Sequence, residues 1–177
     1  VDPTPEQVTG KLCDVAMDPK THRYPVAGGM KNLKREIALY YGRHYQVDLN
    51  GNDDVICTIG SKEGSSHLCL ALLGPGDTVL VPAPACPINV YAAVIAGASV
   101  LRIALDSEEA FIRQLTGMCK ALYPGPKLVM LNYPHNPSGI IASKEFFQEI
   151  VTLANKFNFM VINDFAYGKI TYDGYVA

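Results

Sequence analysis

Three short segments of the sequence combine polar side chains with glycine, proline or an aromatic residue, and each accompanies an apolar run. Residues 58–64 read TIGSKEG, residues 132–139 read NYPHNPSG, and residues 163–167 read NDFAY. An apolar run that ends in such residues predicts a strand followed by a polar loop. Ligands of open parallel sheets bind beyond the carboxyl ends of the strands, so all three segments are candidates for chemistry.

Residues 58–64 suit the binding of an anion. Gly60 lets a ligand approach the backbone closely, and Ser61 is predicted to begin a helix whose unpaired N–H groups attract negative charge. The segment has neither the G-x-x-x-x-G-K-[ST] nor the G-x-G-x-x-G pattern of nucleotide-binding loops. A phosphate site is one interpretation, although an ordinary strand-to-helix turn with a serine cap is the more frequent explanation of such residues.

The other two segments could each hold one fixed polar group. Prolines on both sides of Asn136 stiffen its loop, because proline fixes its own φ and restricts the residue before it. Asp164 follows an apolar strand, where a carboxylate needs a cationic partner from the protein or from a ligand. The alternative for the loop of Asn136 is a rigid structural turn, and the alternative for Asp164 is an aspartate that caps a helix. Together, a phosphate site, an amide donor and an anion match the needs of pyridoxal 5′-phosphate (PLP).

Alternating strands and helices are predicted to position these segments. Short runs rich in Val, Ile and Leu predict strands at residues 54–60, 77–82, 99–105, 127–133 and 159–164. Apolar residues at helical spacing predict helices at residues 61–73 and 88–96, from Asp106 to about residue 122, and at residues 143–157. This alternation predicts an α/β fold with a mostly parallel sheet and helices on both faces.

Two more helices are predicted before this pattern. Thr4 is expected to cap the first, with Pro5 in the first helical position and Gln7 three residues after the cap. The second carries apolar residues at helical spacing and ends near Tyr45. A glycine-rich turn at residues 24–29, YPVAGG, separates the two helices.

The composition excludes several classes of protein. Fifteen Lys and Arg against seventeen Asp and Glu give a net charge of −2, which removes the electrostatic case for binding nucleic acid or a membrane surface. Global disorder does not fit 49% hydrophobic and 18% charged residues. Five cysteines without a C-x-x-C pair and four histidines without an H-x-x-x-H pair predict neither a disulfide framework nor a metal site. With no signal peptide or membrane span visible, we expect a cytoplasmic protein.

The sequence resembles the class I and II aminotransferases of the fold-type I PLP-dependent superfamily over essentially its whole length. The resemblance rests on the YPVAGG turn, GSKEG, Gly76-Asp77-Thr78-Val79, NYPHNPSG and NDFAY, in the order and spacing of the family. Flanking stretches such as THRYPVAGG and ITYDGY look closest to the alanine–glutamate and LL-diaminopimelate aminotransferase branch. The resemblance implies the large domain of an aspartate-aminotransferase-like fold. Residues 1–22 would be an N-terminal segment, and residues 23–177 the first part of the large PLP-binding domain.

For the cofactor ring, the resemblance implies roles for three residues. Asp164 would pair with the pyridinium nitrogen of PLP and keep the ring an electron sink. Asn136 and Tyr167 would form hydrogen bonds with the 3′-oxygen of the ring. Metal ions have no part in this arrangement.

For the phosphate and the ring face, the resemblance implies five more residues. Ser61, Lys62 and Glu63 would hold the phosphate, largely through backbone N–H groups, and Tyr24 would reach the phosphate of a neighbouring subunit, which implies a homodimer with shared sites. Cys86 stands where the family commonly has an aromatic residue on the ring, and it would pack far less area there. Cys86 could instead be a small buried residue, with another group covering the ring.

The family's catalytic lysine, which binds PLP as a Schiff base, belongs to a segment well after NDFAY. Two arginines, one for the phosphate and one for the substrate carboxylate, also come later in the family. The sequence ends at Ala177, before these positions, and neither Lys62 nor Lys169 matches the lysine. The resemblance therefore implies a fragment that contains no catalytic residue and is inactive alone.

The parent protein is expected to be a PLP-dependent transaminase that moves an amino group between an amino acid and a 2-oxo acid. Alanine–glutamate or LL-diaminopimelate transamination is the activity that the resemblance suggests for this parent protein. A PLP-dependent carbon–sulfur lyase and an aminotransferase-like domain of a regulator are alternatives that share these motifs. A nicotinamide-binding domain is the weakest alternative, because the glycine fingerprint is missing.

Overall fold

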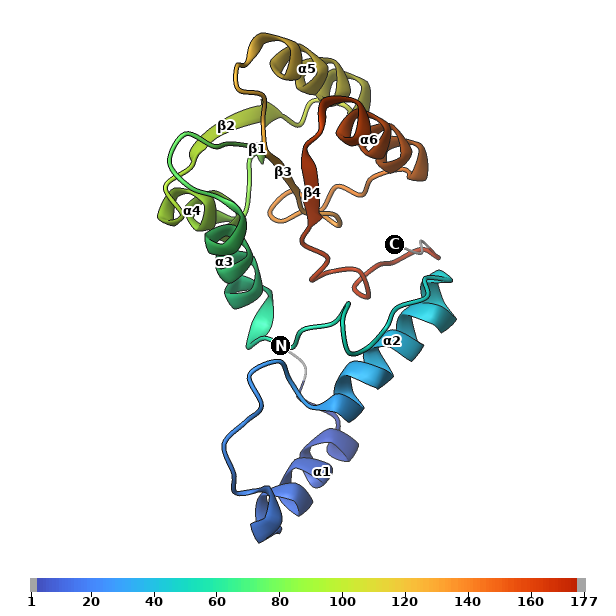
Figure 1. Ribbon diagram of the computed structural model, residues 1–177. Coiled ribbons are helices and arrows are strands. Elements are labelled where there is room, and N and C mark those ends of the chain that lie inside the picture. Colours follow the sequence, from blue (N-terminus) through green and yellow to red (C-terminus); the bar gives the residue numbers. More distant parts are fainter. Residues whose placement is uncertain (1–2, 175–177) are drawn as a thin grey trace. The chain divides into compact units, whose positions relative to one another are not determined.

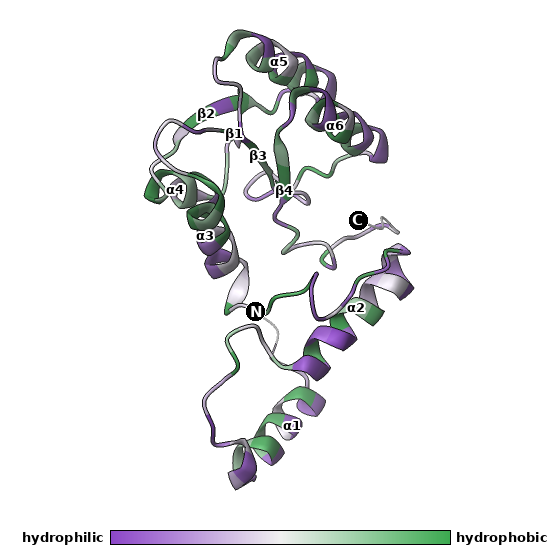
Figure 2. Ribbon diagram, in the orientation of Figure 1, coloured by the Kyte–Doolittle hydropathy of each residue, from purple (hydrophilic) through white to green (hydrophobic). Residues whose placement is uncertain are grey.

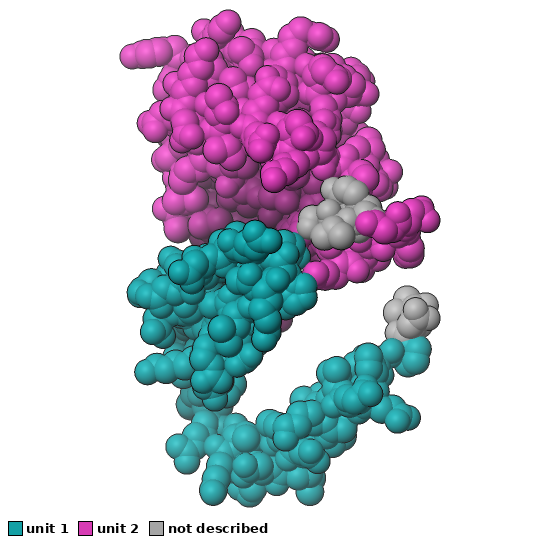
Figure 3. Space-filling model, turned by 90° about the vertical axis from the view of Figure 1, so that its right-hand side faces the viewer, with its two compact units in different colours: residues 1–58 teal, residues 59–177 magenta. Residues whose placement is uncertain are grey.

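A computed structural model describes residues 3–174 of the chain (Figure 1). The chain forms two compact units, which are residues 1–58 and residues 59–177 (Figure 3). The boundary predicted after residue 22 concerns the domains of the family, and it stays a prediction. Tyr175, at the end of the ITYDGY stretch, lies outside the described residues. Within the described part of the chain, no helix has the length and apolar character needed to cross a membrane.

Unit 1 consists of helices and loops. It contains α1 (Glu6–Met17), the short 3₁₀ helix η1 (Pro19–Thr21) and α2 (Lys31–Tyr45). Both α-helices were expected from their apolar spacing, but the start of α1 differs from the prediction. Pro5 takes the N-cap position, and no side chain caps the helix, so Thr4 does not act as the cap. None of the described residues of unit 1 is buried, and apolar residues lie along both helices (Figure 2).

The strand predicted at residues 54–60 is wrong. Residues 55–58 have no regular secondary structure, and the side chains of Ile56 and Ile59 are 72% and 93% exposed. The segment has the composition of a strand, but a strand needs a neighbouring strand to pair its backbone groups. Among the described residues no strand pairs with it, and Cys57 N–H donates a long hydrogen bond to the Gly28 carbonyl, at 3.4 Å.

Unit 2 contains a four-stranded sheet in which every pairing is parallel, as predicted. The strand order is β2-β1-β3-β4. The strands are β1 (Thr78–Ala83), β2 (Ser99–Ala104), β3 (Leu128–Leu131) and β4 (Met160–Asn163). The helices between and before them are α3 (Gly60–Leu72), α4 (Pro87–Ile95), α5 (Glu108–Ala121) and α6 (Lys144–Phe157).

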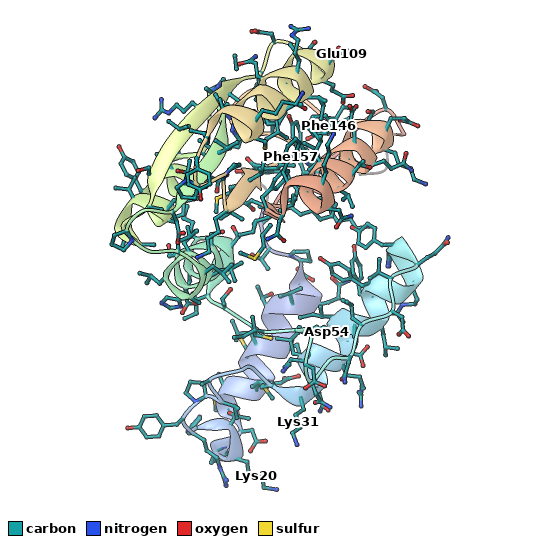
Figure 4. All side chains as sticks on the ribbon, turned by 45° about the horizontal axis from the view of Figure 1, so that its top comes forward. Lys20, Lys31, Asp54, Glu109, Phe146 and Phe157 are labelled. Carbon is teal, nitrogen blue, oxygen red and sulfur yellow. The ribbon has the colours of Figure 1, made fainter. Side chains whose placement is uncertain are left out.

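Helices cover both faces of the sheet, and the central strand β3 is apolar and buried throughout. Along β3, Val129 and Leu131 face a core shared with α5 and α6, while Leu128 and Met130 face a second core shared with α3 and α4. The first core includes Phe146 of α6, with Phe157 packed against it (Figure 4). Alternating side chains of one strand thus supply two cores, which explains why β3 is a continuous apolar run.

Serine caps and one carboxylate fix the starts of α5 and α6. Ser107, rather than Asp106, caps α5 by accepting a hydrogen bond from the backbone of Ala110 at 3.1 Å. Ser143 caps α6 by accepting from Phe146 N–H at 3.0 Å. The Glu108 carboxylate accepts from Ser143 N–H at 2.7 Å and from its hydroxyl at 2.6 Å. These bonds tie the two helix starts together and anchor the loop that follows β3.

Candidate active site at the carboxyl edge of the sheet

The loops that follow β1, β3 and β4 leave the sheet at the same edge, because the strands are parallel neighbours. Cys86 follows β1, Asn136 lies in the loop after β3, and Asp164 directly follows β4. The four-stranded order therefore brings three of the predicted site residues to the carboxyl edge, where ligands of such sheets bind.

A hydrogen bond joins the second and third segments. The Asn136 side-chain amide donates to the Tyr167 hydroxyl at 3.0 Å, across 31 positions of sequence. Asn136 is half-buried, and 37% of Tyr167 is exposed. Both residues line a cavity of about 600 Å³ whose walls also include Pro134, Ile141 and residues 170–173. Two polar side chains from separate motifs thus meet at one open cavity in unit 2.

Asp164 is a half-buried carboxylate that takes part in no ion pair among the described residues. One of its oxygens accepts a long hydrogen bond from Ala166 N–H, at 3.3 Å. Its backbone N–H donates to the Leu131 carbonyl at 2.9 Å, which continues the β3–β4 pairing by one residue. The carboxylate therefore retains the capacity to bind a cationic group.

Two asparagines that the sequence analysis gave no role hold these loops. Asn132 donates to the Asp164 carbonyl at 2.7 Å and accepts from Asn136 N–H at 2.9 Å. Asn163 accepts from Tyr133 N–H at 2.9 Å and donates to the Tyr133 carbonyl at 3.2 Å. The available signal was that the apolar runs LVML and MVI each end in asparagine. A side-chain amide at that place can replace the backbone bonds that two diverging strands lose.

The aromatic residues of the loop after β3 are held in neutral form. Burial, together with the charge of Glu108, raises the pKa of Tyr133 to about 12. Burial also lowers the pKa of His135, whose Nδ1 lies 2.6 Å from the Ser138 hydroxyl. Both side chains are buried in the loop that contains Asn136.

The predicted phosphate residues lie in the first turn of α3. Ser61 and Lys62 are exposed, and their N–H groups belong to the first turn, where no earlier carbonyl of the helix can accept them. The helix begins at Gly60 without a side-chain cap, so the expected serine cap is absent. The Glu63 carboxylate instead accepts from Ile59 N–H. Any anion bound here would contact backbone N–H groups, and the part of these residues in phosphate binding stays a prediction.

The cavity beside Asn136 and Tyr167 is not lined by the other predicted site residues. Cys86 is half-buried in the N-cap position of α4, where no side-chain hydrogen bond caps the helix. It does not line the 600 Å³ cavity, and neither does Asp164 or Ser61. Tyr24 belongs to unit 1 and is 99% exposed. The roles implied for Cys86 and Tyr24 stay predictions.

Comparison with known proteins gives one consistent result. The sequence matches the family described as aminotransferase class I and II over residues 2–177. Glutamate-pyruvate aminotransferase AlaC of Escherichia coli strain K12 is 43% identical over 174 residues, which cover 98% of this chain and 42% of AlaC. An LL-diaminopimelate aminotransferase of Dehalococcoides mccartyi is 38% identical over 173 residues, with 98% and 45% covered. The chain thus spans less than half the length of these curated relatives.

Solved structures share the fold. Apo-BacF of Bacillus subtilis superimposes with a TM-score of 0.87 at 34% identity, covering 94% of this chain and 44% of BacF. An aspartate aminotransferase of Thermotoga maritima superimposes with a TM-score of 0.88 at 29% identity, covering 99% of this chain and 46% of that enzyme.

Proposed function

Because the chain belongs to the class I and II aminotransferase family, we propose that the protein transfers an amino group between an amino acid and a 2-oxo acid with PLP as its cofactor. Members of this family depend on PLP in general. The observation that carries the proposal is the hydrogen bond from Asn136 to Tyr167, at 3.0 Å. It joins the two motifs on which the family resemblance mainly rests, at the edge of the sheet where ligands bind.

The donor set at this edge fits PLP. The Asn136 amide has a second N–H, and the Tyr167 hydroxyl can donate its own proton, so two neighbouring donors remain for an acceptor such as the ring oxygen. Asp164 offers a carboxylate without an ion pair among the described residues, which suits a protonated ring nitrogen. Ser61 and Lys62 offer N–H groups at a helix start for the phosphate. When bound, PLP would supply an electron sink for charge that develops on the substrate.

Each of these site residues then has a physical task. Asp164 would keep the ring nitrogen protonated by electrostatic attraction, and its backbone is held by bonds to Leu131 and Asn132. Asn136 and Tyr167 would orient the ring by donating hydrogen bonds to its oxygen.

The substrate class follows from the relatives. Of the proteins compared above, two curated relatives are named as a glutamate-pyruvate aminotransferase and an LL-diaminopimelate aminotransferase. The test uses the protein as its gene encodes it, loaded with PLP and offered alanine, glutamate or LL-diaminopimelate with pyruvate or 2-oxoglutarate. We expect amino transfer to the 2-oxo acid, measured by NMR. Release of pyruvate from cystathionine without an amino acceptor would instead support a carbon–sulfur lyase.

Asp164→Asn sharpens this test. The substitution removes the negative charge and keeps the size of the side chain, so amino transfer should fall by a factor of about 10² to 10³. Asp106→Asn is the matched control, because Asp106 is an exposed aspartate in a loop after β2. Equal activity of Asp164→Asn and the unaltered protein would contradict the proposal.

We also propose that residues 1–177 alone do not catalyse transamination. Neither Lys62, at the start of α3, nor Lys169 has the sequence context of the family's catalytic lysine. The purified 177-residue chain with PLP, alanine and 2-oxoglutarate should form no glutamate. Turnover by this chain would show that it holds a lysine that the proposal overlooks.

A homodimer with shared sites is the proposed assembly, with Tyr24 contributing to the phosphate site of the neighbouring subunit. Tyr24 is 99% exposed, as a residue that contacts another chain would be. Tyr24→Phe and Asp164→Asn subunits, each impaired alone, should regain activity when mixed, because one site of a mixed dimer keeps both residues. Absence of recovery in dimers shown to be mixed would contradict the sharing of sites.

A further inference from the structure

Asn132 is almost fully buried, with 1% of its surface exposed, and it makes contact with the backbone of two candidate site residues. Its Oδ1 accepts from Asn136 N–H at 2.9 Å, and its Nδ2 donates to the Asp164 carbonyl at 2.7 Å. We propose that Asn132 is a positioning residue that holds Asn136 and Asp164 in register with each other for cofactor binding. This inference rests on the proposed PLP-dependent function.

The position of Asn132 explains why one side chain can reach both loops. The β3–β4 pairing ends at Leu131 opposite Asn163, and the strands then separate. The last backbone bond of this ladder runs from Asp164 N–H to the Leu131 carbonyl at 2.9 Å. Asn132 is the next residue of the chain, and its amide spans the gap that opens between the two loops. It therefore joins the loops where the backbone ladder no longer does.

Only an amide of this length meets both requirements. One atom must accept from Asn136 N–H, and another must donate to the Asp164 carbonyl. Aspartate would lose the donor and bring a charge into a buried place, and serine would have to donate and accept through one oxygen on a shorter side chain. A buried backbone group left without a partner costs about 1–3 kcal/mol, so the loops would shift to find new partners.

Asn163 provides the contrast. It lies at the end of β4 and also makes two side-chain bonds, but both go to the backbone of Tyr133. Tyr133 has no proposed contact with the cofactor. The two asparagines therefore stabilise the same edge of the sheet through similar bonds, and only Asn132 bonds to both Asn136 and Asp164.

If Asn132 positions Asn136, the effects of removing these two side chains on PLP affinity should be coupled. A shift of the Asn136 backbone would misplace the amide that donates to Tyr167 at 3.0 Å. Partners behind a ligand-binding residue typically change affinity by about 10- to 100-fold when removed, as measured at metal sites. If Asn132 acts through Asn136, removing it must matter less once the Asn136 side chain is already gone.

The experiment is a double-mutant cycle on the protein as its gene encodes it, with the PLP dissociation constant measured by equilibrium dialysis. Asn132→Ala should weaken PLP binding about tenfold. In the Asn136→Ala background, Asn132→Ala should weaken PLP binding by a factor at least about three times smaller than in the unaltered protein. A difference of this size is the coupling that residues in contact show. Asn163→Ala is the control, and its effect on PLP binding should be small and independent of Asn136.

A second measurement needs no cofactor. The side-chain amide resonance of Asn136, which reports its bond to Tyr167, should shift in Asn132→Ala and stay in place in Asn163→Ala. If Asn132→Ala does not fold, Asn132→Ser, which keeps one hydrogen-bonding group, takes its place in both measurements. Failure of the unaltered protein to bind PLP would overturn the proposed function and this inference together. Binding of PLP with fully additive losses would overturn the inference alone.

Discussion

The two units of the chain contain helices with similar apolar spacing, but apolar side chains of these helices are buried in unit 2, and none is buried among the described residues of unit 1. In unit 2, α5 buries Leu115 completely against the sheet. In unit 1, α1 carries Leu12 at the same kind of apolar spacing, yet 67% of Leu12 is exposed. None of the described residues of unit 1 is buried, whereas two cores fill the faces of the sheet in unit 2. Apolar spacing thus identifies which face of a helix is apolar, but not whether anything covers that face.

This difference indicates that unit 2 contributes most of the free energy of unfolding. Isolated helices of the length of α1 are marginal in water, because most helical stability in proteins comes from packing. Unit 2 supplies that packing through a sheet that is covered on both sides. We therefore expect substitutions in unit 2 to change the free energy of unfolding and comparable substitutions in unit 1 to leave it nearly unchanged.

Leu115→Ala and Leu12→Ala test the comparison with the largest expected effect. Leu115 is fully buried, so its truncation leaves a cavity and should lower the free energy of unfolding by about 2–5 kcal/mol. Leu12 is 67% exposed, and its truncation should change that value by less than about 0.5 kcal/mol. Urea denaturation followed by circular dichroism measures both. Equal losses would show that α1 has a core of its own.

Helix caps give a second, smaller contrast. Ser143 accepts from Phe146 N–H and also bonds to Glu108, so Ser143→Ala should cost about 1–2 kcal/mol of unfolding free energy. Thr4 precedes a helix that has no side-chain cap, so Thr4→Ala should have no measurable effect. The same denaturation assay applies. A loss from Thr4→Ala that matches the loss from Ser143→Ala would restore the capping role predicted from the sequence.

The smallest effect concerns acid stability. The Lys127 ammonium lies 2.9 Å from the Asp77 carboxylate, and this bond, with one from Gly74 N–H, lowers the pKa of Asp77. A carboxyl group with a lowered pKa in the folded state stabilises the protein above its ordinary pKa, and this stabilisation is lost as the pH falls. Asp77→Asn should therefore flatten the loss of unfolding free energy below about pH 4.

The control for this pH series lies in unit 1. Lys11 and Asp14 are 4.0 Å apart, and their side chains are 75% and 74% exposed. Exposed pairs of this kind contribute little, so Asp14→Asn should leave the acid profile as it is. A larger change from Asp14→Asn than from Asp77→Asn would contradict the assignment of acid sensitivity to unit 2.

Local patterns were sufficient for most of the fold. Runs such as LVML and the apolar spacing of α6 predict their elements, because both faces of the sheet and one face of each helix must be apolar. The prediction of a strand at residues 54–60 was wrong because a strand needs a neighbouring strand to pair with, and the local sequence does not show whether one is present. Thr4 failed as a cap for a related reason, since the chain enters α1 with Pro5 in the capping position.

The candidate site was predictable to a lesser degree. Asn136, Asp164 and Tyr167 stand out as members of polar segments that follow apolar runs, and the structure joins Asn136 to Tyr167. Asn132 was missed because its importance comes from Asp164, 32 positions later in the sequence. Such a bond depends on strand register, which periodicity does not reveal across a parallel crossover.

The double-sided burial of β3 also bears on how the sequence can vary. All four residues of β3 are fully buried, and they alternate between two cores, so no position of the strand has a side chain in water. A polar replacement at any of the four would therefore enter an apolar interior. In a library of random variants selected for folding, β3 should tolerate almost nothing beyond exchange among aliphatic residues. The exposed turns of α1 should accept most substitutions other than proline.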